Sequence, residues 1–215
     1  MIKNKLLFIV FVGLIAFIGL TGCAKREIAN LGSKGTNIIC FGDSITFGYG
    51  VNPGEDYPTA LGKMVAVSVI NCGIDGDTTV EALQRLDEDA LQRDPLLVII
   101  EFAGNDFLRK IPKETTINNV KEMIGRIQAR KAMVAIVDIS AGMFMAEYRG
   151  ALKKLAAEEN VIFVPSVLSG IITNPGMKSD FMHPNAAGYK IVAERIYRMI
   201  KPALEQNAAL RKSKP

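Results

Sequence analysis

Short apolar runs recur along the chain, and each pair is separated by enough residues for one helix. The runs are rich in Val, Ile and Leu and are bounded by Gly, Pro and polar residues, which is typical of strands. The run at residues 95–102 is apolar almost throughout, as expected for a strand in a sheet covered on both faces. The predicted strands are residues 37–41, 68–72, 95–102, 132–139 and 161–164.

The segments between the runs carry apolar residues at helical spacing. In residues 78–92 one face gathers Val80, Leu83, Ala90 and Leu91, and Thr78-x-x-Glu81 matches a capping box at the start. A last helix is predicted from Pro184 to Leu204, with Pro184 in its first turn. The remaining predicted helices are residues 57–67, 115–130 and 146–160.

Five strands that alternate with helices predict a single α/β domain. The expected architecture is a three-layer α/β/α, flavodoxin-like, doubly wound sheet of about five parallel strands. In such sheets ligands bind beyond the carboxyl ends of the strands. The loops in which chemistry is expected therefore begin at Gly42, Gly73, Ala103, Ser140 and Pro165.

The N-terminus has a different apolar pattern. Lys3 and Lys5 precede an unbroken apolar run at residues 6–20, which is typical of a signal peptide and short for a spanning helix. The run ends in Leu-Thr-Gly-Cys, which resembles the bacterial lipobox, and this resemblance implies that Cys23 is lipidated and begins the mature protein. A plain membrane anchor and an ordinary secretory signal are the alternatives.

These patterns divide the chain into four parts. We expect a lipoprotein signal peptide at 1–22, a lipidated Cys23 with a polar tether to residue 36, a folded domain at 37–204 and a basic tail at 205–215. The protein would then be lipid-anchored in the cell envelope, on the extracytoplasmic side of a membrane, in the periplasm or at the cell surface.

Charge and cysteine content narrow the range of partners. Of the 26 Lys and Arg residues, Lys3 and Lys5 precede Cys23, so 24 remain against 22 Asp and Glu, and no nucleic-acid partner is indicated. Cys40 and Cys72 each lie in an apolar strand, where a buried free thiol is expected. A single histidine, His183, and so few cysteines argue against a metal site.

Polar residues suited to chemistry follow the first three strands. Ser44 in "FGDSIT" can place its hydroxyl and its backbone N–H at the sheet edge, although Thr46 at the +2 position departs from the G-x-S-x-G elbow. Gly76 in "GIDGDTT" allows a close approach to a backbone N–H, and Asn105 in "FAGND" offers an amide donor. Taken singly, Ser44 is equally explained as a turn or capping residue, and Gly76 and Asn105 are better explained as turn residues.

The loop after the last strand contains Asp180-x-x-His183. A carboxylate beside an imidazole can accept the Nδ1–H, fix the tautomer and stabilise the imidazolium, whereas a capping pair at the start of a helix is the alternative. Together with Ser44, Gly76 and Asn105, the pair completes the groups that acyl transfer requires, all on carboxyl-end loops of one sheet.

The combination resembles the SGNH, or GDSL-type, hydrolase superfamily. The resemblance spans about residues 37–204, rests on "FGDSIT", "NCGIDGDTT", "FAGND" and "DFMHP" in order, and is nearest to bacterial lysophospholipase, thioesterase and arylesterase-like members. One departure is Ala103, which stands where such proteins often carry glycine.

The resemblance implies a role for each matching residue. Ser44 would be the nucleophile, His183 the general base and then acid, and Asp180 the residue that orients His183. The oxyanion hole would be formed by the N–H groups of Ser44 and Gly76 and by the Asn105 side chain. No cofactor is implied.

The substrate is predicted less directly. Candidate walls of an apolar acyl pocket follow strands three, four and five, although packing beneath the loops explains them equally well. They are Phe107, Leu108, Met143, Phe144, Met145, Leu168, Ile171, Ile172 and Met177. An acyl pocket would indicate a lysophospholipid, monoacyl or aryl ester as substrate. A carbohydrate O-acetyl esterase and a thioesterase are the enzymatic alternatives, and a non-catalytic ligand-binding lipoprotein is the alternative of another class.

Overall fold

The sheet has five parallel strands in the order β2-β1-β3-β4-β5. The computed structural model describes residues 27–143 and 145–213, so the predicted signal peptide, Cys23 and Phe144 lie outside the described residues. The order of the strands and the helical connections confirm the predicted doubly wound α/β fold. The strands are β1 (Asn37–Gly42), β2 (Ser68–Gly73), β3 (Pro95–Glu101), β4 (Met133–Val137) and β5 (Ile162–Val164).

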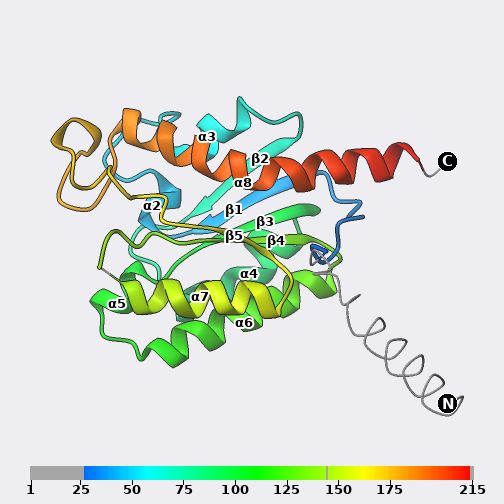
Figure 1. Ribbon diagram of the computed structural model, residues 1–215, viewed down its shortest axis with the longest axis horizontal. Coiled ribbons are helices and arrows are strands. Elements are labelled where there is room, and N and C mark those ends of the chain that lie inside the picture. The colour runs from blue at the N-terminus through cyan, green and yellow to red at the C-terminus, as the bar shows by residue number, and fades with distance from the viewer. Residues whose placement is uncertain (1–26, 144, 214–215) are drawn as a thin grey trace, which may run out of the picture.

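Helices cover both faces of the sheet (Figure 1). One face carries α3 and α8, which pack against each other, and the opposite face carries α4, α6 and α7. The helices are α2 (Ser44–Phe47), α3 (Tyr57–Gly62), α4 (Thr79–Leu86), α5 (Gly104–Leu108), α6 (Lys113–Ala129), α7 (Ala146–Glu158) and α8 (Ala186–Lys212), with shorter turns η2 (Asp87–Leu91) and η3 (Pro175–Met177).

The period of two in a strand divides each apolar run between these two layers. In β1, Ile38 and Cys40 pack in the core beneath α3 and α8, whereas Ile39 and Phe41 pack in the core beneath α4 and α6. Both faces are therefore buried, which explains why the strands read as continuous apolar runs. Cys40 and Cys72 are both free and buried, and they belong to opposite cores.

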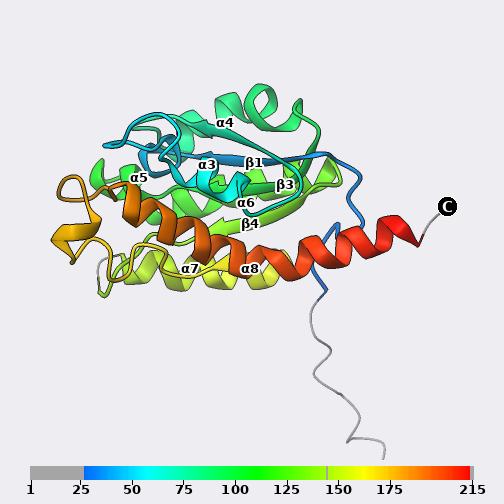
Figure 2. The same cartoon turned by 90° about the horizontal axis from the view of Figure 1, so that it is seen from above.

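The last helix differs from its prediction at both ends. It begins at Ala186, where the Asn185 side chain caps the N–H of Gly188, so Pro184 precedes the helix and is not in its first turn. It also continues through Lys212, into the segment predicted as a tail. Asn207 is buried there and donates to the carbonyl oxygens of Leu31 and Ser33, which ties this end of α8 to the chain before β1 (Figure 2).

Two other helices are shorter than predicted. The helix α3 ends at Gly62, and α4 ends at Leu86, after which the chain continues in the π-helical turn η2. The capping box of Thr78 and Glu81 is present. Val80, however, is exposed and does not join the buried face. Among residues 27–143 and 145–213, no helix is long and apolar enough to cross a membrane.

The carboxyl ends of the five strands lie at one edge of the sheet. The first turns of α2 and α5 and the loop before α8 gather at this edge, on the left of Figures 1 and 2. A close backbone approach fixes the position of α2, because Gly73 at the end of β2 lies directly against the main chain of Thr46 and Phe47. A Cβ on Gly73 would stand 2.1 Å from the Phe47 nitrogen.

We therefore expect Gly73→Ala to destabilise the fold and displace α2. The clash is with backbone, so relief requires a main-chain shift, which typically costs 1–3 kcal/mol or more (about the cost of overpacking). Gly125→Ala is the matched control, because a Cβ there meets nothing within 4 Å. An alanine inside α6 should increase the free energy of unfolding by about 0.5–1 kcal/mol. Thermal unfolding of the two variants measures both effects. Equal melting temperatures would contradict this account of the β2–α2 contact.

Candidate active site

Ser44 is the first residue of α2, immediately beyond the end of β1. The preceding Asp43 caps the helix by accepting from the N–H of Ile45 at 3.1 Å. The helix lasts only one turn and stops at Gly48, which has φ of +90°. This sharp strand-to-helix turn holds the Ser44 side chain at the edge of the sheet with only 8 % of its surface exposed.

The structure brings Ser44 together with His183 and Asp180. His183 Nε2 lies 3.0 Å from Ser44 Oγ, and His183 Nδ1 lies 2.8 Å from Asp180 Oδ2. The three side chains form a continuous hydrogen-bonded relay from a hydroxyl through an imidazole to a carboxylate. Ser44 and His183 are 139 positions apart in the chain.

A tight turn fixes the carboxylate of this relay. The N–H groups of Met182 and His183 both donate to Asp180 Oδ1 at 2.8 Å, which leaves Oδ2 for the imidazole. Partial burial opposes ionisation, but these two N–H groups and the His183 ring outweigh it and hold the pKa of Asp180 at about 2. Asp180 is therefore a carboxylate at any pH at which an ester is usually assayed.

His183 is held from several sides. The Tyr49 ring lies 4.6 Å from the imidazole, centroid to centroid, and the N–H of Ser179 donates to the carbonyl of His183. The Tyr189 hydroxyl on α8 donates to the carbonyl of Tyr49 at 3.1 Å. The packing of α8 thereby sets the position of Tyr49, and Tyr49 in turn limits the rotation of the imidazole.

The two other predicted donors lie in the loop after β2 and in α5. Gly76 has φ of +79°, a left-handed conformation that suits glycine, and its carbonyl accepts from Arg109 at 2.7 Å. Asn105 Nδ2 lies 2.9 Å from the Asp77 carbonyl and 3.2 Å from Asp43 Oδ2. The Asn105 side chain thus connects the loop after β2 with the loop that carries Ser44.

Ala103 occupies a position where glycine is sterically natural. It has φ of +102° and immediately precedes α5, the helix that carries Asn105. A left-handed conformation costs an L-residue about 1–2 kcal/mol, so the chain holds local strain next to the site. The departure noted in the sequence is therefore a strained residue, and it leaves the Asn105 side chain in place.

Arg85 joins three parts of the site and was not predicted. Its guanidinium donates to the carbonyls of Gly42 and Cys72, pairs with Asp77 at 2.6 Å and lies over the Phe41 ring. It thereby binds the ends of β1 and β2 to the loop that follows Gly76. The only signal in the sequence was an arginine in a helix with acidic neighbours, which usually indicates an exposed ion pair.

Two carboxyl groups are buried directly behind Ser44. Glu101 ends β3 with no exposed surface, and its Oε2 accepts from Thr46 at 2.8 Å. Its Oε1 has no donor among the described residues, but it is within reach of the Asp43 carboxyl, which also carries the contact to Asn105. A proton on Glu101 removes this conflict, because an O–H donates to Asp43 where a carboxylate would repel it.

Burial has the same effect on both groups. It raises the pKa of Glu101 well above its usual range, and the neighbouring charge of Asp43 adds to the shift. Burial also raises the pKa of Asp43 to about 6. A proton on the pair favours Glu101, because Asp43 keeps the stabilising donors from Ile45 and Asn105.

An apolar cavity of about 320 Å³ opens beside Ser44. Its polar groups belong to the site just described, and its other walls are mainly aliphatic. These walls come from α2 and from the loops after β4 and β5. The apolar lining residues are Ile45, Ile139, Leu168, Ile172, Phe181 and Met182.

Two of the residues predicted as pocket walls, Leu168 and Ile172, line this cavity. The others do not: Phe107 and Leu108 are exposed on α5, and Met143 after β4 is 94 % exposed. Met145, Ile171 and Met177 also lie outside the lining. Phe144 lies outside the described residues. The walls therefore come mainly from the long loop after β5, which folds back over the active edge of the sheet.

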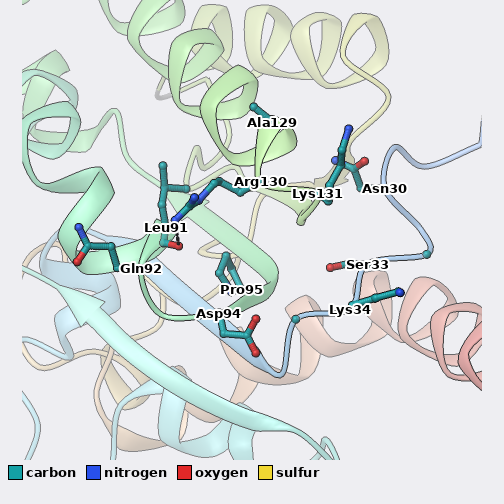
Figure 3. Close-up of a pocket in the computed structure, with 12 residues that line it drawn as sticks. Asn30, Ser33, Lys34, Leu91, Gln92, Asp94, Pro95, Ala129, Arg130 and Lys131 are labelled. Atoms are coloured by element: carbon teal, nitrogen blue, oxygen red, sulfur yellow. Dashed lines mark hydrogen bonds between the residues drawn. The ribbon is translucent and has the colours of Figure 1, made fainter.

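A larger hollow of about 920 Å³ lies at the opposite edge of the sheet (Figure 3). It is lined by the chain before β1, the start of β3 and the turn after α6, with Lys34, Asp94, Arg130 and Lys131 around it. No paired nucleophile and base lie among its lining residues, so the reaction chemistry belongs to the other edge. Within the described residues, no group of three or more His, Cys, Asp or Glu side chains is arranged to hold a metal ion.

Comparison with known proteins finds the same fold and related enzymes. The model of the GDSL-like lipase/acylhydrolase family matches residues 40–191. An arylesterase from Vibrio mimicus is 32 % identical, over 73 % of this chain and 84 % of its own length. Thioesterase 1/protease 1/lysophospholipase L1 from Escherichia coli K12 is 25 % identical, over 80 % of this chain and 86 % of its own length. The crystal structure of TesA superposes with a TM-score of 0.73 at 28 % identity, over 78 % of this chain and 99 % of that one.

The buried carboxyl of Glu101 generates a pH-dependent prediction. Its folded-state pKa is raised above the unfolded value of about 4.3, so its contribution to stability is greatest below that pH and declines as pH rises. Glutamine keeps an acceptor for Thr46 and a donor for Asp43 but cannot ionise. We expect the melting temperature of Glu101→Gln to rise relative to that of the unmodified protein as the pH increases from 5 to 8.

The control is Glu88→Gln, which changes an exposed carboxylate that folding does not bury. Thermal unfolding of the three proteins across the same buffers gives the comparison. A raised pKa of Glu101 would be contradicted if the melting temperature of Glu101→Gln, relative to that of the unmodified protein, stayed constant or fell with rising pH.

Proposed function

The chain belongs to the GDSL-like lipase/acylhydrolase family of carboxylic ester hydrolases, and on that premise we propose that it is a membrane-anchored serine esterase that cleaves acyl esters through Ser44, His183 and Asp180. The observation that carries this proposal is the unbroken relay from Ser44 Oγ through the imidazole to Asp180, with spacings of 3.0 and 2.8 Å. A ligand-binding protein has no need of this relay.

Acylation begins at Ser44. As Oγ attacks the carbonyl carbon of the ester, His183 Nε2 accepts the hydroxyl proton across the 3.0 Å contact. The resulting imidazolium is stabilised by Asp180, which is already ionised and accepts the Nδ1–H. The imidazolium then protonates the departing alcohol, and the acyl group remains on Ser44.

The negative charge on the carbonyl oxygen needs donors. Ser44 and Gly76 offer backbone N–H groups, and Asn105 offers its side-chain amide. The Asp77 carbonyl fixes one Asn105 N–H at 2.9 Å, and the second N–H has only the longer 3.2 Å contact to Asp43. This second N–H is the one that turns to the oxyanion.

Deacylation reverses the roles. Water takes the place of the alcohol, His183 removes its proton, and attack on the acyl carbon passes through a second oxyanion in the same donors. Return of the proton to Ser44 releases the acid and restores the relay. Apart from the ester and water, these steps use only groups of the chain.

The cavity beside Ser44 favours an acyl group of modest size. Its volume of about 320 Å³ is at the lower end of the range for ligand pockets, and the aliphatic walls favour a hydrocarbon chain over a sugar. A thioester is the second candidate, because the same acyl-enzyme forms from it and the related protein from E. coli is named both as a thioesterase and as a lysophospholipase.

The membrane anchor is a separate part of the proposal. Residues 1–22 have the charge and apolar pattern of a signal peptide, and Cys23 follows directly after the small residues that end it. Lipid on Cys23 would hold the enzyme on the extracytoplasmic side of a membrane.

Substitution of the nucleophile tests the activity. We expect the unmodified protein to hydrolyse p-nitrophenyl acyl esters, with a preference for short and medium chains over C16, and Ser44→Ala to lower kcat by about 10⁴- to 10⁶-fold. A spectrophotometric panel from C2 to C16 esters measures both.

Ser169→Ala is the matched control, because Ser169 is exposed and does not line the cavity. It should retain full activity. Equal rates for the unmodified protein and Ser44→Ala across the panel would remove the esterase proposal.

Substitution of Cys23 tests the anchor. We expect Cys23→Ala to lose incorporation of a labelled fatty acid in cells and to leave the membrane fraction with altered processing. Cys72→Ala is the control, because Cys72 is buried and should keep the label. Undiminished labelling of Cys23→Ala would exclude lipidation at that residue.

A further inference from the structure

Large apolar side chains are exposed around the active site and are scarce elsewhere. Within the described residues, all the exposed ones except Met199 and Leu210 lie on segments that follow the carboxyl ends of the strands. Each of the five strand-end segments contributes at least one. We call five of them the apolar rim: Ile74 after β2, Phe47 after β1, Leu108 after β3, Met143 after β4 and Phe181 after β5.

The rim residues gather at the edge of the sheet where the strands end. Neighbouring strands lie about 4.8 Å apart, so the ends of five strands span about 20 Å. Phe181 returns from the loop after β5 to the cavity beside Ser44. Monomeric soluble proteins rarely gather exposed apolar side chains in one region unless the region contacts a partner. Met143 and Phe181 are 94 % and 86 % exposed, so they add nothing to the core.

The rim is continuous with the acyl cavity. Phe181 belongs to both, since it lines the cavity and is also exposed on its outer side. Tyr49, a further exposed ring, lies against His183. An acyl chain that leaves an apolar phase across the rim therefore keeps contact with apolar atoms until it reaches Ser44.

The charges near the rim have both signs. Arg109 pairs with Glu81, and Lys113 pairs with Glu147. Lys110 close to Leu108 in the chain and Asp75 next to Ile74 are exposed, and Lys178 Nζ lies 6.0 Å from the centroid of the Phe181 ring. The described chain enters at the opposite edge, where Ala29 bonds to Asn160 and Thr36 to Asp94, so none of it covers the rim. The rim thus offers apolar side chains bordered by charges of both signs, which suits zwitterionic lipid.

We propose that the apolar rim docks the enzyme on the surface of aggregated acyl lipid, such as a micelle or a bilayer leaflet, and that substrate enters the cavity from that surface. The inference rests on the proposed function, because it takes the cavity as the acyl site. The rim side chains insert among the acyl chains while Ser44 stays above them, and a single lipid moves along Phe181 into the cavity.

The chain contains no tryptophan, so one introduced tryptophan reports on its own surroundings. We would place it at the rim with Met143→Trp in a Ser44→Ala background and add vesicles of phosphatidylcholine. The expected result is a blue shift of the emission and protection from an aqueous quencher. Leu108→Trp provides a second reporter at another part of the rim, in case the first substitution disturbs its loop.

Met199→Trp in the same background is the matched control, because Met199 is an exposed apolar residue on α8, away from the rim. A shift at both rim positions and none at Met199→Trp supports the proposal. No shift at either rim position overturns it, as does an equal shift at all three positions, which indicates that the chain adsorbs without using the rim. A shift that appears with rising protein concentration in the absence of vesicles also overturns it and assigns the rim to a second copy of the chain.

The Ser44→Ala background separates this test from the esterase proposal. Docking is measured without turnover, so failure of the rim to insert leaves hydrolysis of soluble esters unaffected. Conversely, a protein that docks through the rim but whose unsubstituted form cleaves no ester refutes the proposed function alone.

Discussion

The contact between His183 Nε2 and Ser44 Oγ sets the requirements for the rest of the structure. It joins a residue after the interior strand β1 to one that follows the edge strand β5, so the last loop must cross back over the sheet. The start of α8 anchors that return through the bond from Tyr189 to Tyr49, and Arg195 holds the loop by donating to the carbonyls of Val167 and Ser169. The long helix is thus part of the site as well as the cover of one sheet face.

A second layer of polar contacts fixes the donors around Ser44. Arg85 holds the ends of β1 and β2 at a common level, and the pair of Glu101 and Asp43 supports Asn105 from behind. Arg85 and the pair of Glu101 and Asp43 are costly to desolvate. Hydrogen bonds to the backbone or to a neighbouring acid offset that cost. Their value is geometric, because a shift of a few tenths of an ångström at Asn105 or Ser44 would weaken every interaction with a developing oxyanion.

Sequence patterns predicted the parts of this structure that depend on local periodicity and on motif position. The apolar runs gave the five strands, and the residues just beyond them gave Ser44, Asn105, Asp180 and His183, which the structure places around one point. The cavity walls were predictable only in part. Leu168 and Ile172 were expected from their place on the loop after β5, whereas Ile139, Phe181 and Met182 were not. The loop after β5 folds back on the sheet, and no spacing in the chain encodes that path.

Two further differences have physical causes that lie far apart in the sequence. The charged residues at the end of α8 predict a basic tail. In the structure Asn207 is buried there, and its side chain donates to backbone carbonyls that precede β1. Glu101 was visible as a single acid in an apolar run, yet its neutrality depends on Asp43, which lies on a different loop. For polar residues inside apolar patterns, tertiary contacts therefore decide burial and protonation. In this chain they lie either against the site or at the opposite end, where the chain enters the fold. That distribution follows from the parallel sheet: its interior satisfies its own backbone, so buried polar side chains are needed only where strands end and loops must be held.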